Sequence, residues 1–148
     1  MDVDTIVALA TPPGVGAISL VRISGPGAHD LLHALTGEDA PEERRATLVP
    51  IRDPHGGEVI DRGLATVFHA PRSYTGEDMV EISCHGGWLV PRLVLDACVS
   101  AGARQAEPGE FTRRAYLRGK LDLVQAEAVA DLIEGRSRAL HRAAVRQL

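Results

Sequence analysis

Lys120 is the only lysine in a chain whose other basic residues are all arginines. Arginine carries a rigid planar fork, whereas lysine carries a compact and flexible point charge, so a site that needs the second would resist this bias. Lys120 follows Gly119 and precedes Asp122, at a predicted junction between two helices, where rigid elements can hold a ligand-binding side chain. The alternative is a solvated surface charge, which is the commoner fate of a single lysine.

Arg22 and Glu81 each interrupt the apolar pattern of a predicted strand. A charge on a half-buried strand costs free energy unless it is paired. Arg22 therefore either turns its head to solvent or contacts an anion. Glu81 either pairs with Arg22 or accepts two hydrogen bonds from the edge of an amino-pyrimidine.

The other motifs in the sequence mainly argue against particular kinds of catalytic or ligand-binding site. Gly14-Val15-Gly16 lacks the Gly-Lys-Ser/Thr of a phosphate-binding loop. His85-Gly86-Gly87 resembles half of an oxyanion-hole motif, but no Gly-x-Ser-x-Gly elbow accompanies it, so a tight turn from a strand into a helix is the better interpretation. His29 and His33 share a helix face without a third ligand. We therefore predict no catalytic residue and no metal site.

The composition indicates one domain plus a fragment of a second. The chain has 148 residues, of which 45% are hydrophobic and only 3% aromatic, so the core must be aliphatic. Cys84 and Cys98 lack metal-binding or redox spacing, which fits a reducing cytoplasm. The sequence has no apolar run of membrane-spanning length.

The charge is uneven along the chain. The net charge is −4, yet Arg136, Arg138, Arg142 and Arg146 follow the last acidic residue, Glu134. We favour a solvated helix face over a contact with nucleic acid or an acidic partner, because the overall acidity opposes autonomous binding of nucleic acid.

The periodicity predicts strands alternating with helices, hence an α/β (mixed α+β) fold. Strands are predicted at residues 5–10, 17–24, 47–51, 58–60, 63–69, 79–84 and 103–106, and helices at residues 28–35, 89–100 and 108–118. Asp122 and Gln125 have the spacing of a capping box that opens a last helix reaching the end of the chain. That helix would span about 37 Å without a stop signal, which indicates a fragment of a longer chain or a helix that packs on a second subunit.

Short motifs occur in one order along almost the whole chain. They are Asp4-Thr5-Ile6-Val7-Ala8, Thr11-Pro12-Pro13-Gly14, Val21-Arg22-Ile23-Ser24-Gly25, Tyr74-Thr75-Gly76-Glu77-Asp78, Cys84-His85-Gly86-Gly87, Pro108-Gly109-Glu110-Phe111, Gly119-Lys120-Leu121-Asp122-Leu123 and Ala126-Glu127-Ala128-Val129-Ala130-Asp131-Leu132-Ile133. This ordered set resembles the N-terminal part of the tRNA-modification GTPase family called MnmE or TrmE.

The resemblance implies a fold and a function. It implies a mixed-sheet domain at residues 1–119, similar to the folate-binding module of aminomethyltransferases, which binds a tetrahydrofolate derivative (5-formyl or 5,10-methylene) and mediates homodimerisation. Residues 120–148 would be the first long helix of a helical domain. Full-length members act in the cytoplasm with the flavoprotein MnmG (GidA) on the wobble uridine of certain tRNAs, to which a one-carbon unit of the folate is transferred.

Three folate contacts of the family correspond to Arg22, Glu81 and Lys120. The carboxylate of Glu81 suits the N–H donors of a pterin edge. The two cations suit the carboxylates of the glutamate tail or a polarised carbonyl.

This sequence also departs from the family. Val15 stands where the family usually has arginine, which weakens an anion contact by this loop. The GTPase motifs are absent, so GTP, Mg and K would bind only in a GTPase domain that this sequence does not contain. Two alternatives remain open: a dimerisation and scaffold module with a vestigial folate site, and a stand-alone folate-dependent aminomethyl transferase.

Overall fold

The computed structural model describes residues 4–148. The elements follow the chain in the order β1 (Ile6–Leu9), β2 (Gly14–Ser24), α1 (Ala28–Thr36), β3 (Thr47–Arg52), β4 (Val59–Phe68), β5 (Met79–Gly87), α2 (Leu89–Ser100), β6 (Arg104–Gln105), α3 (Glu110–Leu117), α4 (Leu123–Glu134) and α5 (Arg138–Gln147). This is the mixed α/β fold that the alternation of strands and helices predicted.

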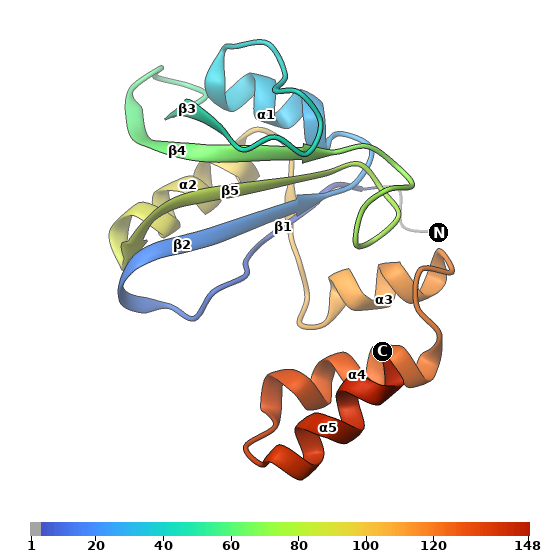
Figure 1. The fold of residues 1–148 in the computed structure, drawn as a ribbon. Helices are drawn as coiled ribbons and strands as arrows, with labels where there is room; N and C mark the ends of the chain where they lie inside the picture. The colour runs from blue at the N-terminus through green and yellow to red at the C-terminus, as the bar shows by residue number, and fades with distance from the viewer. Residues whose placement is uncertain (1–3) are drawn as a thin grey trace. The chain divides into compact units, whose positions relative to one another are not determined.

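The strands form one mixed sheet of order β3-β4-β5-β2-β1-β6 (Figure 1). All neighbours are antiparallel except β1 and β6, which run parallel. The central pair is β2 and β5, which are far apart in sequence. The sheet therefore joins segments from both ends of the first hundred residues.

One face of the sheet carries the hydrophobic core. Side chains alternate between the two faces of a strand, and Val80, Ile82 and Cys84 of β5 all point into this core with Val21 and Ile23 of β2. Residues of α1 and α2 complete the same cluster. Both helices therefore cover one face, which we call the helix face.

The opposite face, which we call the second face, has a different composition. Register places Leu48, Leu64, Ser83 and Leu20 in one row across β3, β4, β5 and β2. Leu48 is 65% exposed and Leu64 is 45% exposed. Polar and charged side chains of β2 and β5 alternate with core residues and lie on this face.

The chain divides into two compact units. The first contains the sheet with α1 and α2, and comprises the chain up to Ser73 together with Glu77–Glu107. The second comprises Tyr74–Gly76 and Pro108–Leu148, and contains α3, α4 and α5. The sequence placed the boundary between the two functional domains between residues 119 and 120, and this boundary stays a prediction.

The predicted capping box at the start of α4 is confirmed. The Asp122 carboxylate accepts the N–H of Gln125 at 2.7 Å, and the Gln125 side chain accepts the N–H of Asp122 at 3.0 Å. These bonds satisfy two of the N–H groups that a helix start leaves without a partner inside the helix.

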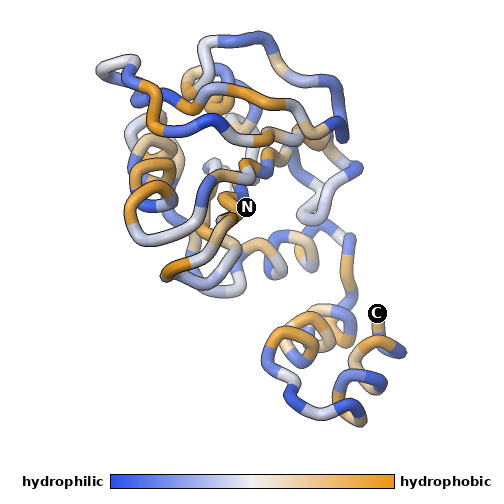
Figure 2. The backbone as a smooth tube through the Cα atoms, turned by 60° about the vertical axis from the view of Figure 1, so that its left-hand side comes forward, coloured by the Kyte–Doolittle hydropathy of each residue, from blue (hydrophilic) through white to orange (hydrophobic). Residues whose placement is uncertain are grey.

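The prediction of a single last helix was wrong. α4 ends at Gly135, whose backbone is extended, and α5 begins after Ser137, whose hydroxyl accepts the N–H of Leu140. The two helices pack on each other, burying Ala128 and Ala144. The break lets α5 fold back on α4 so that these two alanines are covered, which a continuous helix could not do. Figure 2 shows hydrophobic stretches on both helices, and Ile133 is 80% exposed.

Two further element boundaries differ from expectation. Residues 58–60 and 63–69 belong to one strand, β4, because β3 pairs with it continuously across Gly63. β5 runs on through Gly87, where a turn was predicted, because β2 starts early enough to pair Gly14 with Gly87. None of the helices within residues 4–148 combines the length and the apolar character that crossing a membrane requires.

The backbone of β5 lies very close to Gly63 on β4, and this close approach provides a test of how the strands are paired. A Cβ atom at this position would lie 2.4 Å from the carbonyl oxygen of Ser83 on β5. We expect Gly63→Ala to lower the free energy of unfolding by about 1–3 kcal/mol, measured by chemical denaturation. Gly56→Ala in the same hairpin is the matched control, because a Cβ there meets nothing within 4 Å. Equal stability of the two variants would contradict the register described here.

Candidate functional site

Arg22 and Glu81 lie directly opposite each other on β2 and β5. The Arg22 Nε and Nη2 groups both donate to Oε2 of Glu81, at 3.0 and 2.8 Å. Their side chains are 27% and 24% exposed, so the pair is accessible yet partly shielded from solvent. The structure thus brings two of the three predicted site residues into contact on the second face.

The pair leaves part of the carboxylate available. Both bonds from Arg22 end on Oε2, and among the described residues no hydrogen bond to Oε1 of Glu81 is formed. The guanidinium fixes the orientation of the carboxylate, because a planar fork restrains its partner more than a point charge does. The arrangement can accept a donor from a ligand at Oε1 beside a cation that can meet a carbonyl.

Lys120 lies in the second unit, at the junction of α3 and α4, and is exposed. Its N–H donates to the carbonyl of Ala115 at 2.8 Å, which closes the end of α3. Gly119 takes a positive φ of 75° to make this turn possible. That Lys120 joins Arg22 and Glu81 in one site stays a prediction.

A short loop segment packs beside Lys120 within the second unit. A Cβ at Gly76 would lie 3.2 Å from Cγ of Lys120, so the glycine lets the loop approach the lysine stem. The same segment is fixed by the Tyr74 hydroxyl, which lies 2.9 Å from the hydroxyl of Thr112 on α3. These contacts pack the neighbouring loop against the stem of the Lys120 side chain, although the residue as a whole is exposed.

Sequence reasoning missed a buried carboxylate in the first unit. Glu77 is 3% exposed, and its Oε1 accepts the hydroxyl of Ser24 at 2.9 Å. The bond ties the segment that precedes β5 to the end of β2. The only signal in the sequence was the position of Glu77 within a family motif, and the pairing itself needed the fold.

Sequence reasoning also missed the pairing of Asp61 with His85. The β4–β5 ladder ends at Leu64 and Ser83, and beyond this point the Asp61 carboxylate accepts the N–H of His85 at 2.9 Å. The same carboxylate lies 2.9 Å from Nδ1 of the His85 ring. No local pattern could indicate this contact, because the residues lie on different strands and meet only through the register.

Asp61 keeps its charge in this setting. Burial raises the pKa of the carboxyl, but hydrogen bonds from the backbone and ring of His85 and from the N–H of Arg62 outweigh it, and the pKa lies below its ordinary value of 3.8. By contrast, burial and the nearby Asp61 charge raise the pKa of the Cys84 thiol to about 11. Cys84 is therefore a neutral core residue and not a nucleophile.

Gly86, which follows His85, lets β5 approach β2 closely. A Cβ at Gly86 would lie 2.2 Å from the carbonyl oxygen of Gly16 on β2. The motif that resembled half of an oxyanion hole is thus part of the β2–β5 ladder.

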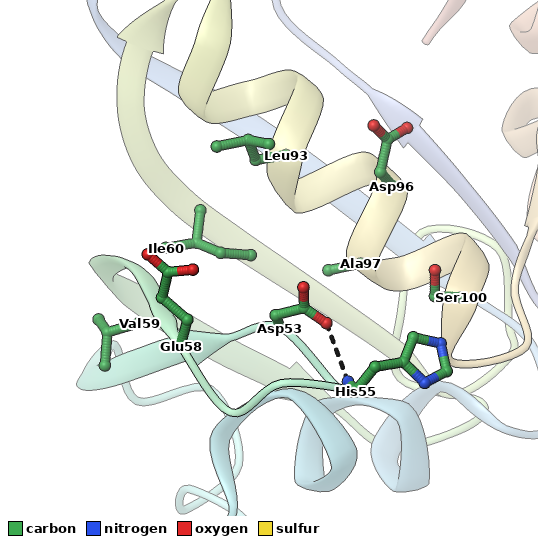
Figure 3. Close-up of a pocket in the computed structure, with 9 residues that line it drawn as sticks. All are labelled: Asp53, His55, Glu58, Val59, Ile60, Leu93, Asp96, Ala97 and Ser100. Carbon is green, nitrogen blue, oxygen red and sulfur yellow. Dashed lines mark hydrogen bonds between the residues drawn. The ribbon is translucent and has the colours of Figure 1, made fainter.

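A separate groove lies between the β3–β4 turn and α2 (Figure 3). Its volume is about 310 Å³, and its lining residues are Asp53, His55, Glu58, Val59, Ile60, Leu93, Asp96, Ala97 and Ser100. The Asp53 carboxylate accepts the N–H of His55 at 2.9 Å and so holds the turn. None of the predicted site residues lines this groove, and residues 4–148 contain no group of histidine, cysteine and acidic side chains able to hold a metal ion.

The fold and the site define a mixed-sheet domain with a charged pair on one face, followed by a helical segment. Residues 5–120 match the family described as GTP-binding protein TrmE N-terminus, and the chain belongs to this family.

Its relatives are tRNA modification GTPases named MnmE. The protein of Cupriavidus pinatubonensis is 52% identical over 97% of this chain and 30% of its own length. That of Legionella pneumophila is 47% identical over 100% of this chain and 33% of its own length. The protein of Thermotoga maritima is 48% identical over 98% of this chain and 32% of its own length. This chain therefore spans about a third of the length of these relatives.

The shifted pKa of Asp61 leads to a prediction about acid stability. A carboxyl whose folded pKa is depressed stabilises the fold above its unfolded pKa, and this contribution is lost as the pH falls through the folded pKa. We expect the free energy of unfolding of the unaltered chain to fall more steeply between about pH 5 and pH 2 than that of Asp61→Asn. Denaturation curves across this range measure the difference. Asp30→Asn, on the exposed surface of α1, is the control for loss of a charge, and parallel curves for Asp61→Asn and the unaltered chain would contradict the prediction.

Proposed function

We propose that this chain is the folate-binding, dimer-forming part of a tRNA-modifying GTPase. In the full protein it would present a one-carbon tetrahydrofolate, 5-formyl or 5,10-methylene, for modification of the wobble uridine of tRNA at C5. The partners would be a second copy of the chain, the flavoprotein MnmG and tRNA. The full protein would act in the cytoplasm. GTP hydrolysis, with Mg and K, would belong to a separate GTPase domain, because this sequence has no Gly-Lys-Ser/Thr loop.

The observation that carries the proposal is the Arg22–Glu81 pair. An amino-pyrimidine edge offers adjacent N–H donors beside a ring carbonyl. The oriented carboxylate of Glu81 fits the donors, and the guanidinium 2.8 Å from it fits the carbonyl. Lys120, from the second unit, supplies a third contact in this proposal. When bound, the folate supplies the one-carbon unit, and the residues of this chain hold and orient it.

Folate binding is tested by isothermal titration calorimetry with 5-formyltetrahydrofolate. We expect Glu81→Ala to weaken binding at least tenfold, because a hydrogen bond to a charged group contributes about 1.5–3 kcal/mol. Lys120→Ala should weaken binding by a smaller factor, because Lys120 is exposed. Glu58→Ala, another glutamate of the first unit, is the matched control. Unchanged affinity in Glu81→Ala would remove this residue from the site.

A second candidate is a dimerisation and scaffold module whose folate site is vestigial. One observation favours it: Arg22 and Glu81 already form an ion pair with each other without a ligand. Val15, which replaces the usual arginine of the family, is 95% exposed and adds no charge to this end of the domain.

The oligomeric state separates the two candidates when it is combined with calorimetry. We expect sedimentation velocity to show a dimer of the 148-residue chain at micromolar concentration, with folate bound. A stable dimer that gives no binding heat would favour the scaffold module. A monomer that binds folate would contradict the proposed dimerisation.

A further inference from the structure

The arginines of α5 form a single row along the surface of this helix. Arg138, Arg142 and Arg146 follow one another at intervals of four residues, and residues at this interval lie on the same side of a helix. The row is about 12 Å long, because a helix rises about 1.5 Å per residue. We call these three side chains the arginine row. α5 contains no acidic residue, so nothing on the helix itself neutralises them.

The arginine row lies on the side of α5 that is turned away from α4. Ala144 is buried where the two helices pack on each other. Each residue turns a helix by about 100°, so Arg142, two residues before Ala144, lies on the opposite side of α5. All three arginines of the row are exposed. The row therefore belongs to the outer surface of the α4–α5 hairpin and not to its packing interface.

The positive charge of the arginine row is not neutralised by neighbouring side chains. Within residues 4–148, none of the ion pairs includes an arginine of the row, although α4 carries acidic residues. Nε of Arg146 instead donates to the carbonyl oxygen of Arg142 at 3.2 Å, which holds its guanidinium along the helix. Like charges four residues apart destabilise a helix. The row therefore opposes formation of α5, and no ion pair in the described part of the chain compensates for it.

A hollow on the surface of α5 includes two arginines of the row. Its volume is about 460 Å³, and it is lined by His141, Arg142, Val145 and Arg146. Val145 is the one apolar side chain among these four. The core of a protein–protein interface is usually apolar and poor in charge, whereas an interface with nucleic acid is polar and positively charged. The composition of this surface therefore favours a nucleic acid over a protein as its partner.

We propose that the arginine row binds the phosphate backbone of tRNA. The guanidinium group is always charged, and its planar fork donates two parallel N–H bonds to a phosphate. A row of such groups fits a row of phosphates, each of which carries a negative charge. This inference rests on the proposed function, in which tRNA is a partner, and it assigns to the tRNA a surface on the second unit.

The contact supplies affinity and orientation, but it does not read the sequence of the tRNA. Contacts to phosphates fix the position of a protein on a nucleic acid, and base contacts provide specificity. The chain as a whole has a net charge of −4, which opposes binding. We therefore expect a weak interaction, with a dissociation constant of about 1–100 μM at physiological salt, that tightens as the salt concentration is lowered.

The test measures binding of end-labelled tRNA to the 148-residue chain by fluorescence anisotropy. The triple variant Arg138→Gln, Arg142→Gln and Arg146→Gln, which we call the row variant, removes the three charges. Glutamine is a good helix former, so α5 is kept, and circular dichroism checks that it is. Affinities are measured between about 50 mM and 200 mM salt, the range in which phosphate contacts lose strength most visibly.

A control variant changes the net charge by the same amount elsewhere. It combines Arg45→Gln, Arg62→Gln and Arg92→Gln, three exposed arginines of the first unit. We expect the row variant to bind tRNA about tenfold more weakly than the control variant at the lowest salt concentration. The slope of the logarithm of affinity against the logarithm of salt concentration should become shallower by about 2, because each lost phosphate contact removes about 0.7–0.9. The control variant should keep the slope of the unaltered chain.

The outcomes separate this inference from the proposed function. Equal affinities and slopes for the row variant and the control variant would show that net charge alone matters, and would overturn the inference. Polyglutamate is the second probe: binding as tight as that of tRNA, with the same loss in the row variant, would assign the row to an acidic protein instead. Absence of tRNA binding by the unaltered chain at low salt would also overturn the inference. The folate site would be untouched by any of these results, because calorimetry with 5-formyltetrahydrofolate tests it separately.

Discussion

The pairing of β2 with β5 is the constraint on which the rest of the first unit depends. It joins the two ends of the sheet domain and places Arg22 opposite Glu81. Side chains alternate between faces, so a slip of one residue between the strands would turn one of the two charges toward the aliphatic core under α1 and α2 and separate it from its partner. Burying an unpaired charge there is costly. The hydrophobic pattern of both strands therefore sets the position of the charged pair.

Glycine makes this pairing possible at its tightest point. The carbonyl oxygen of Gly16 comes so close to Gly86 that no side chain fits there. Gly63 plays the same part where β4 approaches Ser83. The two close contacts hold β4, β5 and β2 at a fixed spacing, and the Asp61 carboxylate then lies next to His85. Polar groups that recognise a ligand are most precise when rigid strands carry them.

The Arg22–Glu81 pair has a consequence for binding. An ion pair that forms without a ligand prevents the carboxylate and guanidinium from turning away from each other, which would lower the ordering cost of binding a ligand. In the proposed folate site the pair would also give selectivity, since a ligand that offers only donors or only acceptors would pair with one member alone. The second unit contributes differently: Lys120 sits on a helix junction fixed by Gly119, and α4 and α5 form a hairpin whose outer apolar residues, such as Ile133, stay exposed.

The sequence by itself determined the fold class, most strands and helices, and the family. The reason is that these follow from local periodicity and short ordered motifs: the Asp122–Gln125 capping box, for instance, needs only three residues of spacing. It also singled out Arg22 and Glu81, because a charge within an apolar strand is visible in one dimension. The sequence left two alternatives for Glu81, which were pairing with Arg22 or binding the edge of an amino-pyrimidine, and it could not decide between them.

Only the tertiary structure decided how these residues meet. The Arg22–Glu81 contact and the Asp61–His85 contact both depend on strand register, which is a property of the whole sheet. The break between α4 and α5 has a similar origin: the local pattern suits one long helix, but the packing of Ala128 and Ala144 needs two helices that fold back on each other. Contacts between distant residues depend on packing, and packing is set by the free energy of the assembled core and not by any single segment.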